Sequence, residues 1–138
     1  MDGSASTLAL IAACGVALAA CSSSSSVYTA DPNVFPADYK KQILLTLTQT
    51  LDDPTNIKDA GITDPVLRTA GKEQRYAVCV RLNARDANRR YTGVKERIAY
   101  FYAGGLNQMV DADQGQCANA AYQAWAELEK YCLAKSCA

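Results

Sequence analysis

Apolar residues recur at helical spacing in the segment that follows residue 35. Five of them form one stripe: Tyr39, Ile43, Leu44, Leu47 and Leu51. Positions three or four apart lie on the same face of a helix, so this stripe predicts an amphipathic helix that packs on a core. Pro36 stands where a helix tolerates proline, and Pro54 disfavours helical backbone at the residue before it. The pattern therefore predicts a helix over residues 36–51.

From residue 56 onward the period of the pattern changes to two, which is typical of strands. In residues 74–83 the two faces read Tyr76, Val78, Val80 and Leu82 against Arg75, Ala77, Cys79 and Arg81. Residues 94–102 alternate again, with Val94, Ile98, Tyr100 and Tyr102 opposite Lys95, Arg97 and Phe101. Gly104-Gly105 predicts a tight turn into a further strand over 106–110, and residues 56–63 are a shorter candidate. Together these segments predict a three- to four-stranded antiparallel meander.

The last segment returns to helical spacing over residues 117–133. One side of this helix would carry Ala118, Ala121, Tyr122, Trp125 and Leu128. The complete pattern predicts an α+β fold with an N-terminal helix, an antiparallel meander and a C-terminal helix. We expect one domain over residues 36–138, because about 100 folded residues are the usual size of a single domain.

The N-terminal residues have a different composition. Residues 7–20 form an apolar run of 14 residues, which is shorter than the roughly 20 needed to span a bilayer and typical of a signal peptide. Leu18-Ala19-Ala20-Cys21 resembles the lipobox of bacterial lipoproteins, in which the chain is cut before the Cys and the thiol receives diacylglycerol. The resemblance implies a signal peptide over 1–20, lipidation of Cys21 and a Ser-rich tether over 21–35. The alternative is an uncleaved N-terminal anchor.

Cysteine usage agrees with an exported chain. Four cysteines remain after the lipobox: Cys79, Cys117, Cys132 and Cys137. An even number outside the cytoplasm predicts two disulfides with three possible connectivities, of which we favour Cys79–Cys117 and Cys132–Cys137. The alternative, a zinc site, normally uses CxxC pairs or histidines, and the sequence contains neither.

The residue types exclude the common catalytic sites. The chain has no histidine, which removes Ser-His-Asp and Cys-His catalysis and the usual zinc hydrolase centres. The carboxylate pairs Asp52/Asp53 and Asp111/Asp113 stand at the ends of predicted elements, where aspartate ordinarily serves caps and turns. The sequence therefore predicts no enzyme and no cofactor.

Charge is balanced overall and uneven locally. The chain has 14 basic and 14 acidic residues, but residues 68–97 contain nine basic and three acidic side chains. We expect a basic hairpin with Arg75, Arg81, Lys95 and Arg97 on one face and Arg85, Arg89 and Arg90, with Tyr91, at its tip. Such a patch favours an acidic envelope component as partner. The alternative is a solvated face that pairs internally with acidic residues, and nucleic acid is not expected.

A family resemblance is carried by Asp53-Pro54, Val78-Cys79, Asn83-Ala84 and Tyr91-Thr92-Gly93. This order is similar to that of small uncharacterised lipoproteins and secreted proteins of proteobacteria, over roughly residues 35–117. The resemblance implies a fold and a location and no catalytic residue. The residues themselves predict that Asn83 and Gly93 shape the turn and that the Tyr91 hydroxyl pins it.

These observations predict a lipid-anchored envelope protein that binds and does not catalyse. Ser22, rather than Asp, follows Cys21, which favours the periplasmic face of the outer membrane. Two alternatives stay open. One is an inhibitor of a secreted hydrolase such as lysozyme, which would insert the loop over residues 84–93, and the other is a structural subunit of an envelope assembly.

Overall fold

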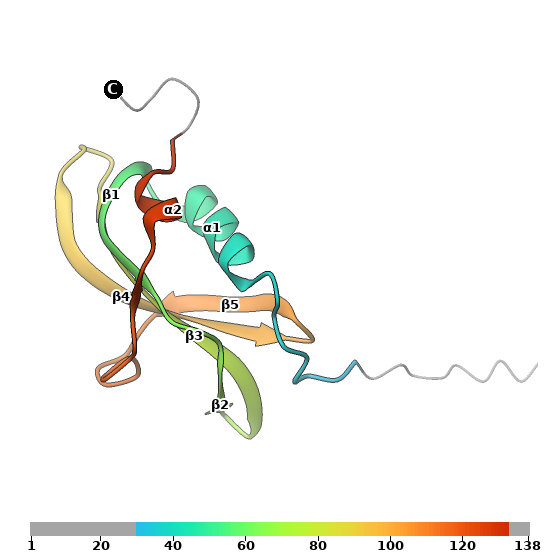
Figure 1. Cartoon of the computed structure of the whole chain (residues 1–138). Helices are drawn as coiled ribbons and strands as arrows, with labels where there is room; N and C mark the ends of the chain where they lie inside the picture. The colour runs from blue at the N-terminus through green and yellow to red at the C-terminus, as the bar shows by residue number, and fades with distance from the viewer. Residues whose placement is uncertain (1–29, 133–138) are drawn as a thin grey trace, which may run out of the picture.

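The computed structural model describes residues 30–132. An antiparallel sheet with helix packed against it makes up this part of the chain (Figure 1), so the predicted α+β class is confirmed. In chain order the elements are α1 (Tyr39–Thr50), β1 (Asp53–Ile62), β2 (Val66–Ala70), β3 (Glu73–Arg85), β4 (Tyr91–Tyr102), β5 (Gly105–Asp111), β6 (Gln123–Ala124) and α2 (Ala126–Glu129).

The long strand β3 organises the sheet. Five of the six strands in the described sheet follow the order β5-β4-β3-β1-β6, and β2 pairs with β3 outside this path. Along one side of β3, its first residues pair with β2 and its later residues with β1, where Val80 stands opposite Ile62. Along its other side, β4 accompanies β3 from Ala77 opposite Tyr100 to Arg85 opposite Tyr91. A strand of 13 residues can therefore hold three neighbours at once.

The alternation in β3 reflects two buried faces. Val78, Val80 and Leu82 belong to the main core, which the α1 side chains Ile43 and Leu47 cover. On the opposite face a smaller cluster contains Ala77, Cys79, Ile98 and Cys117. Figure 1 shows α1 across one face of the sheet, with α2 beside it. Cys117 brings the segment before β6 to the other face. Even-numbered residues of β3 therefore point into the main core, and odd-numbered residues point to the opposite face.

Strand β2 was not expected from the sequence. Its five residues, Val66–Ala70, follow Pro65 and lack a clean alternation, and they pair with β3 from Val66 opposite Ala77. The turn between β2 and β3 contains Gly71 at φ +66°, a backbone conformation that favours glycine. The Gly71-Lys72 turn was the local signal for this hairpin.

The predicted helix over residues 117–133 is wrong for the described part of that range. Most of this stretch forms turns and the short strand β6, and its helical residues are the four of α2. The reason is that Cys117 lies on one face of the sheet, whereas Trp125 and Leu128 are buried in the core on the other. One straight helix cannot reach both faces, so the chain crosses at the β1 edge, where Ala124 pairs with Gly61.

The predicted disulfide between Cys79 and Cys117 is confirmed, with Cα atoms 5.9 Å apart. It fixes the C-terminal segment to the middle of β3. In the second predicted pair, Cys132–Cys137, Cys137 lies outside the described part of the chain. Cys21 and the predicted signal peptide also lie outside it. Within residues 30–132, no helix combines the length and the apolarity that a bilayer crossing requires.

Replacing both Cys79 and Cys117 by Ala tests how much the cross-link stabilises the domain. The bond closes a loop with a sequence separation of 38, so its loss should lower the free energy of unfolding by about 4 kcal/mol through the entropy of the unfolded chain. Urea unfolding followed by the fluorescence of Trp125 measures the change. A loss below about 1 kcal/mol would contradict this account of the disulfide.

Candidate binding site on the long hairpin

The candidate site lies on the hairpin formed by β3 and β4. We call the five-residue turn between these strands, residues 86–90, the hairpin tip. The eight residues expected to contact a partner all lie on this hairpin: Arg75, Arg81, Arg85, Arg89, Arg90, Tyr91, Lys95 and Arg97. The structure places two of them on the α1 side of the sheet, two on the opposite side, and four at or directly beside the hairpin tip.

The prediction that Arg75, Arg81, Lys95 and Arg97 share one face is wrong. Lys95 stands opposite Leu82, and Arg97 stands opposite Val80. Directly opposed residues of an antiparallel pair point to the same side, so both cations lie on the α1 side of the sheet. Arg75 and Arg81 are separated from Cys79 by an even number of residues along β3, so they lie with it on the opposite side of the sheet, which we call the outer face. Alternation within each strand predicts two faces, whereas the register between strands, which the sequence does not state, decides which faces coincide.

The two arginines on the outer face are engaged within the domain. Arg75 forms an ion pair with Glu73 at 2.6 Å and stacks over the Tyr102 ring at 4.7 Å. Arg81 stacks over the Tyr122 ring at 4.8 Å. The Tyr122 hydroxyl donates a hydrogen bond to a Glu96 oxygen at 2.8 Å, and burial together with this bond raises the pKa of Tyr122. This outer face therefore resembles the internally paired alternative more than a free basic patch.

Arg85 is also committed to an internal contact. Its Nη2 lies 2.7 Å from Asp53 Oδ2 and 3.2 Å from Thr55 Oγ1, with 19% of the Arg85 side chain and 15% of the Asp53 side chain exposed. The Asp53 carboxylate accepts hydrogen bonds from the hydroxyl and the backbone N–H of Thr55. The Thr55 hydroxyl and, to a lesser degree, the Arg85 charge hold the pKa of Asp53 below its usual value. This ion pair fastens the end of β3 to the start of β1.

The hairpin tip is a turn built around one carboxylate. Asp86 Oδ1 accepts hydrogen bonds from the backbone N–H groups of Asn88 and Arg90, at 2.9 and 3.0 Å. These bonds, that of Arg90 first, lower the pKa of Asp86. Arg89 takes φ +61°. Both arginines are exposed, and among residues 30–132 Arg89 forms no ion pair, while Arg90 reaches Asp86 at a long 3.6 Å. The tip therefore presents two cations from a fixed backbone.

Tyr91 braces the tip against β1, as its predicted pinning role requires. Its hydroxyl donates a 2.7 Å hydrogen bond to the Asn56 carbonyl, and the Lys58 ammonium lies 4.5 Å from the centre of its ring. Across the hairpin, the Asn83 side-chain oxygen accepts a 3.1 Å hydrogen bond from Gly93 N–H, and Gly93 has φ +91°. Asn56 and Lys58 were missed by sequence reasoning, because nothing local links them to Tyr91.

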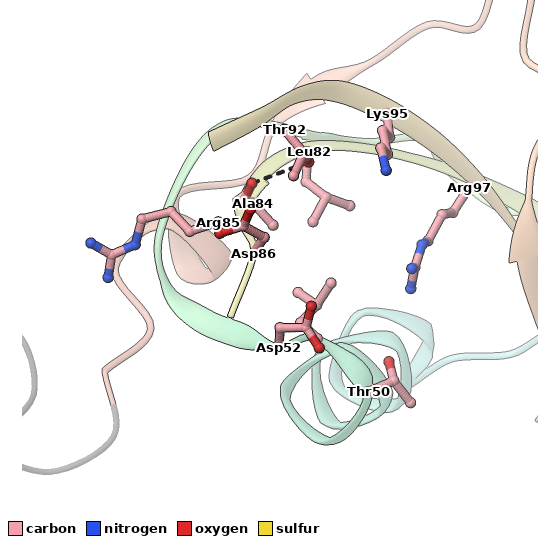
Figure 2. Close-up of a pocket in the computed structure, with 10 residues that line it drawn as sticks. Thr50, Asp52, Leu82, Ala84, Arg85, Asp86, Thr92, Lys95 and Arg97 are labelled. Atoms are coloured by element: carbon pink, nitrogen blue, oxygen red, sulfur yellow. Dashed lines mark hydrogen bonds between the residues drawn. The ribbon is translucent and has the colours of Figure 1, made fainter. Parts of the chain in front are cut away.

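The two cations on the α1 side face an open cavity (Figure 2). It has a volume of about 160 Å³ and lies between the end of α1 and the inner face of the hairpin. In Figure 2, Lys95 and Arg97 point into this space opposite Thr50 and Asp52, whereas Arg85 points away from it. Arg97 also forms an ion pair with Asp111 at 3.2 Å. The cavity walls thus carry both signs of charge.

The predicted carboxylate pairs are separated by these contacts. Asp53 binds Arg85, while its neighbour Asp52 lines the cavity. Asp111 binds Arg97, and the backbone of Asp113 exchanges two hydrogen bonds with Gln116 in a turn. In the part of the chain that the structure describes, no group of three or more His, Cys, Asp or Glu side chains could hold a metal ion.

A comparison of the chain with known proteins found no matching family model, no matching curated protein and no matching solved structure.

The Asp53–Arg85 pair leads to a pH-dependent prediction. At neutral pH, Asp53→Asn should lower the free energy of unfolding by about 2 kcal/mol, because Arg85 would lose its charged acceptor in a half-buried site. Since the pKa of Asp53 is lowered in the folded state, its contribution is present above the ordinary value of 3.8 and is lost as the pH falls through the folded pKa. The variant and the parent should therefore converge in acid.

Urea unfolding at a series of pH values makes this measurement. Asp52→Asn is the matched control, because it removes the adjacent, exposed carboxylate and should change the free energy of unfolding by less than about 0.5 kcal/mol. A constant difference between Asp53→Asn and the parent at every pH would contradict the ion-pair argument.

Proposed function

We propose that this chain is a lipid-anchored protein of the bacterial cell envelope that binds an acidic envelope component through its hairpin tip. Its anchor would be Cys21, and its place the periplasmic face of the outer membrane, for the reasons that the lipobox resemblance and Ser22 give. The proposed role is binding, and no reaction is assigned to the chain. Resemblance to small proteobacterial lipoproteins supports the same location.

The observation that carries the binding role is the pair of exposed arginines on a fixed turn. Arg75, Arg81 and Arg85 are occupied by contacts inside the domain, and Lys95 and Arg97 face α1. The proposed contact surface therefore narrows from eight residues to Arg89 and Arg90. Their backbone is already ordered by Asp86, so binding would cost little conformational entropy. Two exposed cations attract phosphate or carboxylate groups and raise the rate of encounter.

Reversing the charge of the tip tests this role. We expect the double variant Arg89→Glu/Arg90→Glu to retain about tenfold less partner than the parent, because two exposed charge contacts would become repulsive. The measurement is affinity purification of the full-length lipidated protein from envelope extracts at low and high salt, with the bound component quantified. The parent should lose partner as the salt concentration rises.

Lys40→Glu/Lys41→Glu is the matched control, since it makes the same change of charge on α1. Equal retention of partner by the tip variant and the parent would remove the tip from the binding surface. Equal losses in both double variants would show that net charge, and not the tip, governs the interaction.

A second candidate function, inhibition of a secreted hydrolase, is favoured by the stiffness of the same turn. Glycoside hydrolases carry two catalytic carboxylates in a cleft, and a rigid basic loop complements such a cleft in shape and charge. Because Arg85 and Tyr91 fasten the strand ends beside the tip, the part of the loop free to insert is limited to residues 86–90.

A lysozyme assay decides between the two candidates. If the chain is an inhibitor, the purified full chain in mild detergent should slow the clearing of a cell-wall suspension, and Arg89→Glu/Arg90→Glu should abolish the effect. Absence of inhibition by the parent at micromolar concentration would rule out lysozyme as the target and leave the binding role in place.

A further inference from the structure

The described chain begins on one end of the sheet and is fixed there. Pro32 accepts a hydrogen bond from Ala103 N–H at 3.3 Å, in the turn between β4 and β5. The Phe35 ring meets the Tyr76 ring edge-on, with centroids 5.3 Å apart, and Pro36 is buried. Figure 1 shows this segment passing beside the β4–β5 turn before α1 begins. The point where the N-terminal segment joins the domain is therefore defined by contacts.

The same end of the sheet exposes apolar side chains. We call it the apolar end and define it by Val34, Phe35, Leu67, Tyr76 and Tyr102. Phe35 is 53% exposed, Leu67 43% and Tyr102 40%. Leu67 stands opposite Tyr76 in the sheet, and Tyr102 is the last residue of β4. Aromatic residues with a polar edge, combined with aliphatic neighbours, suit the boundary between lipid and water.

The arginine at this end is paired. Arg75, which stacks over the Tyr102 ring, is neutralised by Glu73 at 2.6 Å. Attraction to a surface would therefore depend on the apolar side chains and not on anionic lipid. This separates the apolar end from the hairpin tip, which exposes the cations Arg89 and Arg90.

The short connection between Cys21 and the apolar end favours the membrane as the surface that this end contacts. Residues 22–29 separate Cys21 from Ala30, and this connection spans at most about 30 Å when fully extended. Strand β3 has 13 residues and so extends over at most about 40 Å between its start and the hairpin tip. A lipid on Cys21 can keep the apolar end at the membrane, whereas the tip lies at the far end of the β3–β4 hairpin.

We propose that the apolar end docks on the lipid surface and that the hairpin tip points away from the membrane. This inference rests on the proposed lipidation of Cys21. Phe35, Leu67 and Tyr102 enter the interfacial region of the bilayer, and the sheet stands as a spacer that presents Arg89 and Arg90 to components farther out. The lipid and the apolar end then form two attachments, so the domain has a fixed orientation.

The test places a fluorescent reporter at each end of the same strand. Tyr102→Trp reports on the apolar end, and Val94→Trp is the matched control, because Val94 lies on the same face of β4 near the tip and is 54% exposed. Both variants keep the buried Trp125 as a common background. The full-length lipidated proteins are bound to phosphatidylcholine vesicles with brominated acyl chains, and binding is checked by flotation.

We expect bromine to quench the added tryptophan of Tyr102→Trp and to leave that of Val94→Trp unquenched. Adding Phe35→Ser and Leu67→Ser to Tyr102→Trp should remove the quenching while the protein still floats. Floating protein with no quenching at either position, or with equal quenching at both, overturns the docking and leaves the lipid anchor intact. The Cys21→Ala variant, which lacks the lipid, should not float. If the parent protein also fails to float, the anchor and the docking are both overturned.

Discussion

Burial of the strand β3 on both of its faces is the constraint on which the rest of the domain depends. Val78 and Val80 are fully buried beneath α1, and Cys79, between them in sequence, is buried on the other side. A strand with two apolar faces needs cover on both. Helix α1 supplies one layer, and the chain after β5 must supply the other before it returns to the core through Trp125 and Leu128. The disulfide to Cys117 fixes the place of this crossing.

The same constraint explains the arrangement of the arginines. Every second side chain of the central strands points to a face that another segment covers, so a cation that is buried there needs an acceptor or an aromatic ring. Arg81 lies over Tyr122, and Arg68 donates to the carbonyl of Gln116, both in the covering segment. Basic residues on β2 and β3 therefore help to hold the C-terminal segment on the sheet, while Arg89 and Arg90 stand exposed where the hairpin extends past this cover.

Much of the sheet was predictable because its signals are local. Alternation along residues 74–83 and 94–102 and the glycine turn before β5 follow from short stretches. The cysteine count predicts two disulfides but leaves three connectivities, of which the favoured one contains Cys79–Cys117. The failures are not local. The basic face required the register that sets Lys95 opposite Leu82, and the ion pair of Arg85 with Asp53 joins distant parts of the chain. In the C-terminal segment, Tyr122 and Trp125 have helical spacing but pack on opposite faces of the sheet. The apparent helical pattern therefore combines residues that are buried in two different clusters.

Both ends of the domain are braced by contacts between elements. At one end, Gln42 of α1 donates to the Gly104 carbonyl and accepts from Leu106 N–H, which ties the helix to the β4–β5 turn. At the other, Arg85 and Tyr91 tie the hairpin to β1. The tip is therefore anchored to β1, and α1 is anchored to the β4–β5 turn. These contacts tie each end of the long hairpin to an element that is distant in the sequence.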